Sequence, residues 1–297
     1  METDIERLHI LFRRARALPE LPGPAMRLAQ VIETGDASLG EVERIICTDA
    51  GLAVRVLRAS NTAKFAAIEP VVTLRGAIMR LGFKSVRSLA LSFAIHDVIR
   101  IGKTEIDMQR FAFHSVFVGL LARYIFARHD DRGGSSNGLT GDELFALGIL
   151  HDLHVPLLAQ VAPLVLQRVM NYARRQSLTV EAAFDKLYSE PMSSLGAAAA
   201  ATWKLPDLFL KGIRGMREPW VEEELFTAWS CLAYAEYLAV SHGAATERWP
   251  VNSSVPEDVR AEVGLADEEV EPLLDLIGDL TRQYLDESTN TKQVCAA

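Results

Sequence analysis

Apolar residues recur at the 3.6-residue period of an α-helix along most of this chain, and this pattern restricts the fold more than any other feature. Between residues 86 and 101 the apolar side chains fall on one helical stripe, formed by Val86, Leu89, Ala90, Phe93 and Ala94. No run of alternating apolar and polar residues is long enough to demand a β-strand. We therefore predict an all-α protein.

Helix start and stop signals divide the chain into many short helices. Ser38 with Glu41, and Thr140 with Glu143, form two capping boxes that open helices. Helices are predicted over 39–48, from Asp49 through Ser60, from Thr73 to Gly82, over 86–101 and 108–128, from Thr140 to a stop at Pro156, and over 163–176, 179–189, 192–203, 206–215, 219–241 and 267–287. Residues 130–141 are predicted to form a flexible loop, and residues 243–257 a linker.

Composition indicates a folded protein of the cytoplasm. Of the 297 residues, 49% are hydrophobic, which is enough for a large core. The 3 cysteines include no CxxC pair, so neither a disulfide framework nor a thiolate zinc site is expected. The first 20 residues lack the features of a signal peptide, and the weakly charged stretch SSLGAAAAATW is too short to cross a bilayer. We expect no membrane insertion.

Charge is distributed unevenly, but it does not indicate a nucleic-acid partner. Residues 1–104 contain 15 Lys and Arg against 11 Asp and Glu, a net of +4, which leaves −12 for the rest of a chain whose net charge is −8. The basic residues are spaced like solvated helix faces and have no interleaved aromatic residues. No nucleic-acid binding is expected.

One pair of residues could carry metal chemistry. His151 and Asp152 lie near the end of a predicted helix, and His114 lies on the apolar face of the preceding long helix, so the two helices could bring these side chains together. Buried histidines with hydrogen-bond partners would give the same pattern. His154 could face the same side, although a surface or helix-end position is the simpler expectation. The sequence contains no glycine-rich phosphate loop, GxSxG elbow or HExxH motif.

The order of several motifs resembles the HDOD domain, a signalling relative of the HD phosphohydrolases. The motifs are the paired Leu-Pro near the start, Asn61, Leu81-Gly82, the His-Asp pair, and Trp203 followed by Leu205-Pro206, and the resemblance covers roughly residues 10–240. It implies a two-lobed helical fold, in which a helical N-terminal lobe (1–104) packs on an HD-like helical lobe (105–245). A linker and a C-terminal helix would follow (246–297). Asn61 itself is expected to bond a neighbouring backbone.

The resemblance also implies a remnant metal site. It would consist of His114, His151, Asp152 and Glu236, where Glu236 stands in the place of a usual aspartate, and it would be vacant or structural. Relatives carry HDIGK where this chain has HDLHV, so Val155 replaces a lysine. Histidines of many relatives are replaced by Met192, Met216 and Arg217. Thioether sulfur is a poor ligand for a hard cation.

These departures favour a regulatory role over catalysis. The prediction is a non-catalytic bacterial signal-transduction module that recognises a signalling protein partner. It would have no catalytic residues and no cofactor beyond, at most, a single divalent metal. The alternatives are a metal-dependent phosphodiesterase or nucleotidase that uses the same four residues, and a binder of a nucleotide second messenger.

Overall fold

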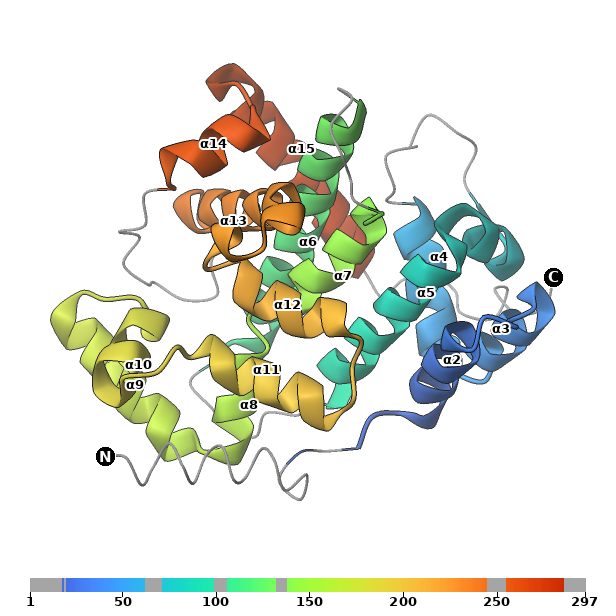
Figure 1. Ribbon diagram of the computed structural model, residues 1–297, viewed down its shortest axis with the longest axis horizontal. Helices are drawn as coiled ribbons and strands as arrows, with labels where there is room; N and C mark the ends of the chain where they lie inside the picture. The colour runs from blue at the N-terminus through green and yellow to red at the C-terminus, as the bar shows by residue number, and fades with distance from the viewer. Residues whose placement is uncertain are drawn as a thin grey trace.

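The computed structural model describes residues 18, 20–61, 71–98, 106–131, 138–244 and 255–285, and these contain helices but no strand (Figure 1). The all-α prediction is confirmed. The elements are α2 (Gly23–Glu33), α3 (Leu39–Cys47), α4 (Ala50–Asn61), α5 (Leu74–Val98), α6 (Met108–Asp131), α7 (Gly141–Leu150), α8 (His154–Val161), α9 (Pro163–Gln176), α10 (Val180–Tyr188), α11 (Ser193–Thr202), α12 (Asp207–Gly215), the 3-10 turns η1 (Pro219–Val221) and η2 (Glu223–Leu225), α13 (Phe226–Ser241), α14 (Glu257–Val263) and α15 (Asp267–Leu285).

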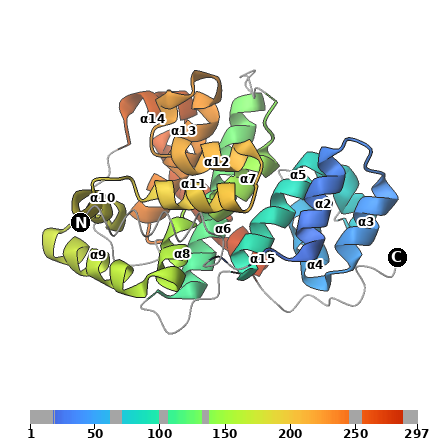
Figure 2. The same ribbon diagram turned by 60° about the horizontal axis from the view of Figure 1, so that its bottom comes forward.

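Helix α5 connects an N-terminal group of helices to the rest of the molecule. Its first part packs with α2, α3 and α4, and the helix also packs along α7 (Figure 2). Gly82 kinks it, with φ 77° and ψ 161°. The positive φ agrees with the predicted helix end, but the ψ lies outside the left-handed helical region and a second helical segment follows at once. The predicted lobe of residues 1–104 is therefore tied to the second lobe by a shared helix.

The centre of the molecule is a close crossing of α6 and α7. A side-chain carbon added to Gly148 would lie 2.3 Å from the Cα of Gly119, so the two backbones touch with no side chain between them. Around this crossing, Phe145 and Leu144 of α7 and Leu121 of α6 are buried. Apolar burial of this kind contributes about 25 cal/mol for each Å² removed from water. The crossing fixes the distance between the residues that α6 and α7 carry.

Two predicted helix boundaries were wrong. The helix that Thr140 caps ends at Leu150, and Pro156 does not stop it but lies in the first turn of the next helix, α8, where a missing N–H costs nothing. The predicted helix 219–241 is two 3-10 turns followed by α13. Most of the predicted linker 243–257 lies outside the described residues, and α14, a short helix that was not predicted, begins at Glu257. Part of the predicted loop at 130–141 lies outside the described residues.

Asn61 bonds neighbouring backbone, as predicted. Its side-chain amide donates to the carbonyl of Val71 at 2.8 Å, and its side-chain oxygen accepts from the N–H of Val71 at 2.8 Å. These two bonds join the end of α4 to the segment before α5. They satisfy backbone groups that a turn would otherwise leave exposed to water.

The C-terminal helix α15 belongs to the core. It packs on α6 and α4, and the ring of its Tyr284 meets Phe145 edge-on with centroids 5.5 Å apart. Arg58 of α4 donates to the backbone carbonyl of Tyr284 at 2.8 Å. The predicted third segment, 246–297, thus includes a helix that holds both lobes.

Two stretches are long and apolar enough to cross a membrane by length and composition. They are Met108–His129, which is 72% buried within the fold, and Gly141–Val161, which is 89% buried. Both contribute to the central crossing, and burial of this extent is typical of helices in a protein core.

Candidate metal centre

His114 and His151 are each oriented by a backbone carbonyl. His114 comes from α6 and its Nδ1 lies 3.1 Å from the carbonyl of Ala244, while His151 follows the last residue of α7 and its Nδ1 lies 2.6 Å from the carbonyl of Gly148. A carbonyl only accepts, so each Nδ1 carries the hydrogen. In the neutral rings each Nε2 is then a free lone pair, which is the arrangement of histidines that bind metals.

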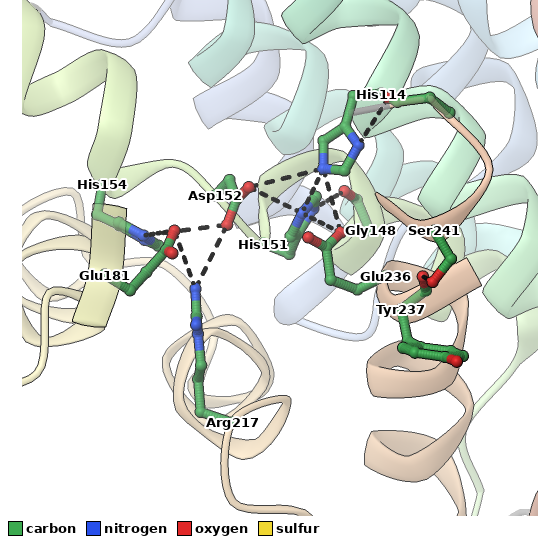
Figure 3. Close-up of polar contacts among 11 residues, drawn as sticks. His114, Gly148, His151, Asp152, His154, Glu181, Arg217, Glu236, Tyr237 and Ser241 are labelled. Carbon is green, nitrogen blue, oxygen red and sulfur yellow. Dashed lines mark hydrogen bonds and ion pairs between the residues drawn. The ribbon is translucent and has the colours of Figure 1, made fainter. Parts of the chain in front are cut away.

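These two Nε2 atoms meet two carboxylates (Figure 3). The Nε2 atoms of His114 and His151 are 3.2 Å apart. Oε2 of Glu236, from α13, lies 3.1 Å from the first and 3.2 Å from the second. Oδ2 of Asp152 lies 3.6 Å and 3.2 Å from the same two atoms. The structure therefore brings together all four residues of the predicted remnant site, in one cluster of ligand atoms.

The spacing of these atoms suits one metal ion. A tetrahedral ion with bonds of about 2.1 Å holds its donors about 3.4 Å apart, close to the separations in the cluster. Two imidazole nitrogens and two carboxylate oxygens are borderline ligands that zinc and other transition ions accept. While both Nε2 atoms are unprotonated, the buried Oε2 of Glu236 has no hydrogen-bond partner among the described residues. A cation would bind this oxygen. It would also remove the repulsion between the lone pairs of the two Nε2 atoms, so the residues fit a divalent metal.

Without a metal, protons take the place of the cation. Burial opposes the charge on His114, but the Glu236 carboxylate and hydrogen bonds to Asp152 and Glu236 outweigh it and raise the pKa of His114 to about 9. Burial likewise opposes the charge on His151, yet Asp152 and Glu236 raise its pKa well above the usual value. Burial favours the neutral acid of Glu236, but the two histidines lower its pKa to about 2. Two imidazolium ions facing two carboxylates carry no net charge, as do two neutral imidazoles and two carboxylates around a divalent ion.

A second group of polar residues adjoins the first through Asp152. Its other oxygen, Oδ1, lies 3.9 Å from Nε2 of His154 and 3.9 Å from Nη2 of Arg217. Oε1 of Glu181, in α10, lies 3.8 Å from the same His154 nitrogen and 3.1 Å from Nη2 of Arg217. Figure 3 shows this group on the opposite side of Asp152 from His114 and His151. One carboxylate thus belongs to both groups.

The position of His154 agrees with one of the two expectations from the sequence. This residue is the first of α8, so a helix-end position is correct, but its exposed fraction is 0% and a surface role is wrong. Neither ring nitrogen has a hydrogen-bond partner among the described residues. Leaving a buried polar group unpaired costs about 1–3 kcal/mol.

Three of the residues at which this sequence departs from the family pattern are apolar and buried. Val155 is 3% exposed, Met192 1% and Met216 5%, and all lie in the hydrophobic core. None of these side chains can bind a phosphate by charge. Arg217 differs from them, since its guanidinium reaches the second group of residues.

The sequence analysis missed Glu181 and gave Arg217 no role in the site. Glu181 lies in the first turn of α10, about thirty residues from the His-Asp pair, and no local spacing connects them. The only signal in the sequence was the substitution at 217 itself, which placed a cation where relatives of the resembled family carry a ligand.

Comparison with known proteins identifies the family. The sequence profile of the HDOD domain matches residues 18–219, about two thirds of the chain. The chain belongs to the HDOD family. The HDOD match begins before α2 and ends at η1, so it covers α2 to α12, whereas α13 with Glu236, α14 and α15 lie beyond it.

Solved structures share the HDOD fold. An HDOD domain protein with unknown function from Geobacter sulfurreducens gives a TM-score of 0.70 at 20% identity, over 95% of this chain and 99% of that one. A provisionally named signal transduction protein from Marinobacter aquaeolei VT8 gives 0.68 at 19%, over 95% of this chain and 64% of that one. A provisionally named metal-dependent phosphohydrolase from Shewanella amazonensis SB2B gives 0.64 at 19%, over 96% and 100%. The predicted two-lobed HDOD fold is confirmed.

A curated relative agrees in sequence over a similar span. An uncharacterized protein of Treponema pallidum (strain Nichols) is 22% identical over 219 residues, which are 73% of this chain and 41% of the relative. The chain thus spans about two fifths of the length of the curated relative that it matches.

Proposed function

We propose that this HDOD protein is a non-catalytic module of bacterial signal transduction, built around one structural metal ion and acting by binding a protein partner. His114, His151, Asp152 and Glu236 would hold the ion. The observation that carries the proposal is the cluster of four protein donors, in which each histidine nitrogen lies 3.1–3.6 Å from the other nitrogen and from both carboxylate oxygens. Structural metal sites fill every position with protein ligands, whereas catalytic sites keep one open.

The surroundings of the cluster also favour a structural role. Phosphoryl chemistry needs an activated water and positive charge directed at the phosphate. His114, His151 and Asp152 are buried, and only Glu236 has a partly exposed side chain, at 26%. The nearest cation, Arg217, is already paired with Glu181 at 3.1 Å. A bound metal would supply positive charge that replaces the two ring protons and joins α6, α7 and α13.

Metal content and hydrolysis together test the metal part of this proposal. Protein purified without chelator is expected to contain one equivalent of a transition metal by mass spectrometry, and His151→Ala to contain none. His129→Ala is the matched control, since His129 lies outside the cluster on α6 and should leave the metal in place. Neither the unmodified protein nor either variant should hydrolyse phosphodiester or nucleotide substrates. Metal-dependent turnover that His151→Ala abolishes would instead establish the protein as a phosphohydrolase.

A partner surface is proposed at η1. Trp220 and Val221 are 54% and 64% exposed, and large exposed apolar side chains in a polar surround mark protein contacts. The provisional name of the Marinobacter aquaeolei protein places a relative of the same fold in signal transduction. Partner recognition by this chain would therefore use the short turns between α12 and α13.

A crosslinking comparison tests the partner surface. A photo-crosslinker placed at Val221 in living cells should give one defined adduct, and Trp220→Ala should reduce its yield at least about tenfold, as a buried interface tryptophan commonly contributes 2 kcal/mol or more. Leu164→Ala, which removes an exposed large apolar side chain from α9, is the control and should not change the yield. Equal loss in both variants, or no adduct under signalling and resting conditions, would contradict the proposal.

A further inference from the structure

The carboxylate of Asp152 faces two groups of residues with its two oxygens. Oδ2 belongs to the proposed metal centre, 3.2 Å from Nε2 of His151. Oδ1 points the other way, toward His154, Glu181 and Arg217 (Figure 3). This second oxygen is buried and has no hydrogen-bond partner among the described residues. Oδ1 is therefore available to a second cation, on the side of Asp152 that faces away from the proposed metal centre.

The second group contains the ligand types that would hold such a cation. Oδ1 of Asp152, Nε2 of His154 and Oε1 of Glu181 lie within 4.8 Å of one another. His154 is fully buried, and both of its ring nitrogens lack hydrogen-bond partners in the described part of the chain. Its Nε2 lies 3.8 Å from Glu181 and 3.9 Å from Asp152, distances too long for hydrogen bonds but suited to atoms that share a cation. One imidazole and two carboxylates form a complete set of protein ligands for a divalent ion.

A cation is already present in this group, and it is an arginine. Nη2 of Arg217 lies 3.1 Å from Glu181 and 3.9 Å from Asp152, so its charge offsets that of Glu181 and lies beside the Asp152 oxygen that would ligate a metal. The guanidinium stays charged at any pH at which the protein folds. The side chain begins after α12 and is 38% exposed, so it enters the group from the surface. It can be replaced without rebuilding the core around it.

We infer that Arg217 takes the place of a second divalent ion beside Asp152 and so limits this protein to a one-metal centre. The inference rests on the proposed metal centre and explains why the chain would hold one ion and not two. Removing the guanidinium charge leaves Asp152, His154 and Glu181 as an unneutralised ligand set. That set should then take up a metal ion itself.

Substitution of Arg217 tests the inference through metal stoichiometry. Arg217→Met keeps much of the side-chain volume and removes the charge. After dialysis against Mn²⁺, Arg217→Met should hold one ion more than the unmodified protein, and the added ion should give an electron paramagnetic resonance spectrum of two magnetically coupled Mn²⁺ ions. Coupling requires the ions to be neighbours, so an ion bound elsewhere on the surface would not produce it. An unchanged ion count in Arg217→Met, or two ions in the unmodified protein, would overturn the inference.

Matched variants separate the added site from general effects of substitution. Arg217→Lys keeps a cation and Arg214→Met removes an exposed arginine of α12, so neither should gain an ion. The double variant Arg217→Met with His154→Ala should lose the added ion. Arg217→Met with Glu181→Gln removes both charges of the pair; it should fold in chelator and gain no ion. If Arg217→Met alone unfolds in chelator, Mn²⁺ should restore its cooperative thermal transition, and failure to restore it would count against the inference.

The two proposals can fail separately. An unmodified protein that holds no metal would refute the proposed metal centre. The inference about Arg217 would still be tested by the metal content of Arg217→Met. One bound ion that is lost on His154→Ala would support the inference, and the absence of a bound ion would refute it.

Discussion

His114 and His151 each use one ring nitrogen for orientation and leave the other for the cluster. The carbonyls of Ala244 and Gly148 hold the two Nδ1 hydrogens, so rotation of either ring would break a buried hydrogen bond. Partners of this kind raise the basicity of a histidine ligand and fix its direction. The same cluster that would bind a metal therefore binds protons well when the metal is removed.

Metal affinity should consequently fall as the pH falls. The pKa of His114 in the metal-free protein is raised to about 9, and that of His151 is also raised, so both rings are protonated at neutral pH. Metal binding must release these protons, so protons compete with the metal more strongly at lower pH. Between pH 8 and 6 the metal affinity should therefore drop by about 10-fold to 100-fold for each pH unit. Isothermal titration in buffers of different ionisation enthalpy measures the protons released. An affinity that does not change over this range would contradict the proposed ligand set.

At the level of single residues, sequence reasoning could identify the site only in part. The resemblance placed His114, His151, Asp152 and Glu236 in one set because each follows a motif that keeps its order along the chain. Glu181 and Arg217 follow no such motif, and their contact depends on how α10 and the end of α12 pack beside α8. His154 begins a helix, as expected, but its burial could not be predicted, because it depends on how α10, which carries Glu181, packs beside the start of α8.

Among the elements, the break between α7 and α8 and the crossing of α6 with α7 position the cluster. Capping boxes and apolar periodicity predicted most helices because these signals are local. Pro156 was misleading since proline is accepted in the first turn of a helix as readily as it ends one. The short helix α14 and the 3-10 turns carry too few residues for a period to show.

The crossing predicts a sharp response to a single methyl group. In Gly148→Ala the new carbon would meet the backbone of Gly119 at 2.3 Å, so α6 and α7 must separate. Forced overpacking costs about 1–3 kcal/mol, and the separation would also part His114 from His151. We expect a lower midpoint of urea unfolding and weaker metal binding. Gly40→Ala is the control, because it lies on an exposed face with nothing within 4 Å and should be neutral or slightly stabilising. Equal stability of both variants would show that the crossing is looser than described.

At the scale of the whole molecule, both α5 and α15 join the two lobes. Tyr284 packs against Phe93 of α5 and Phe145 of α7, and its carbonyl accepts from Arg58 of α4. The sequence predicted α15 as a helix from its period, but it could not show which surface the helix covers, since that depends on pairing across more than two hundred residues. The family profile ends before this helix begins.

Tyr284 should therefore be important for its ring and not for its hydroxyl. The hydroxyl is buried without a hydrogen-bond partner in the described residues, so Tyr284→Phe removes an unpaired polar group and should leave the free energy of unfolding unchanged or raise it by about 1 kcal/mol. Tyr284→Ala removes the ring and should cost about 3–5 kcal/mol. Chemical denaturation of the three proteins measures both effects. A large loss in Tyr284→Phe would reveal a hydroxyl partner outside the described residues.

The contact between Gly119 and Gly148 also bears on how far such a sequence can diverge. Where side chains separate two helices, each change of volume in the core moves the helices, and anything mounted on them moves too. Here the backbones themselves set the separation of the two helices. The distance between His114 and His151 therefore does not change when the leucines, valines and phenylalanines nearby are substituted. Two residues without side chains can thus preserve a ligand geometry while the rest of the interface drifts, which suits a fold retained at about 20% identity.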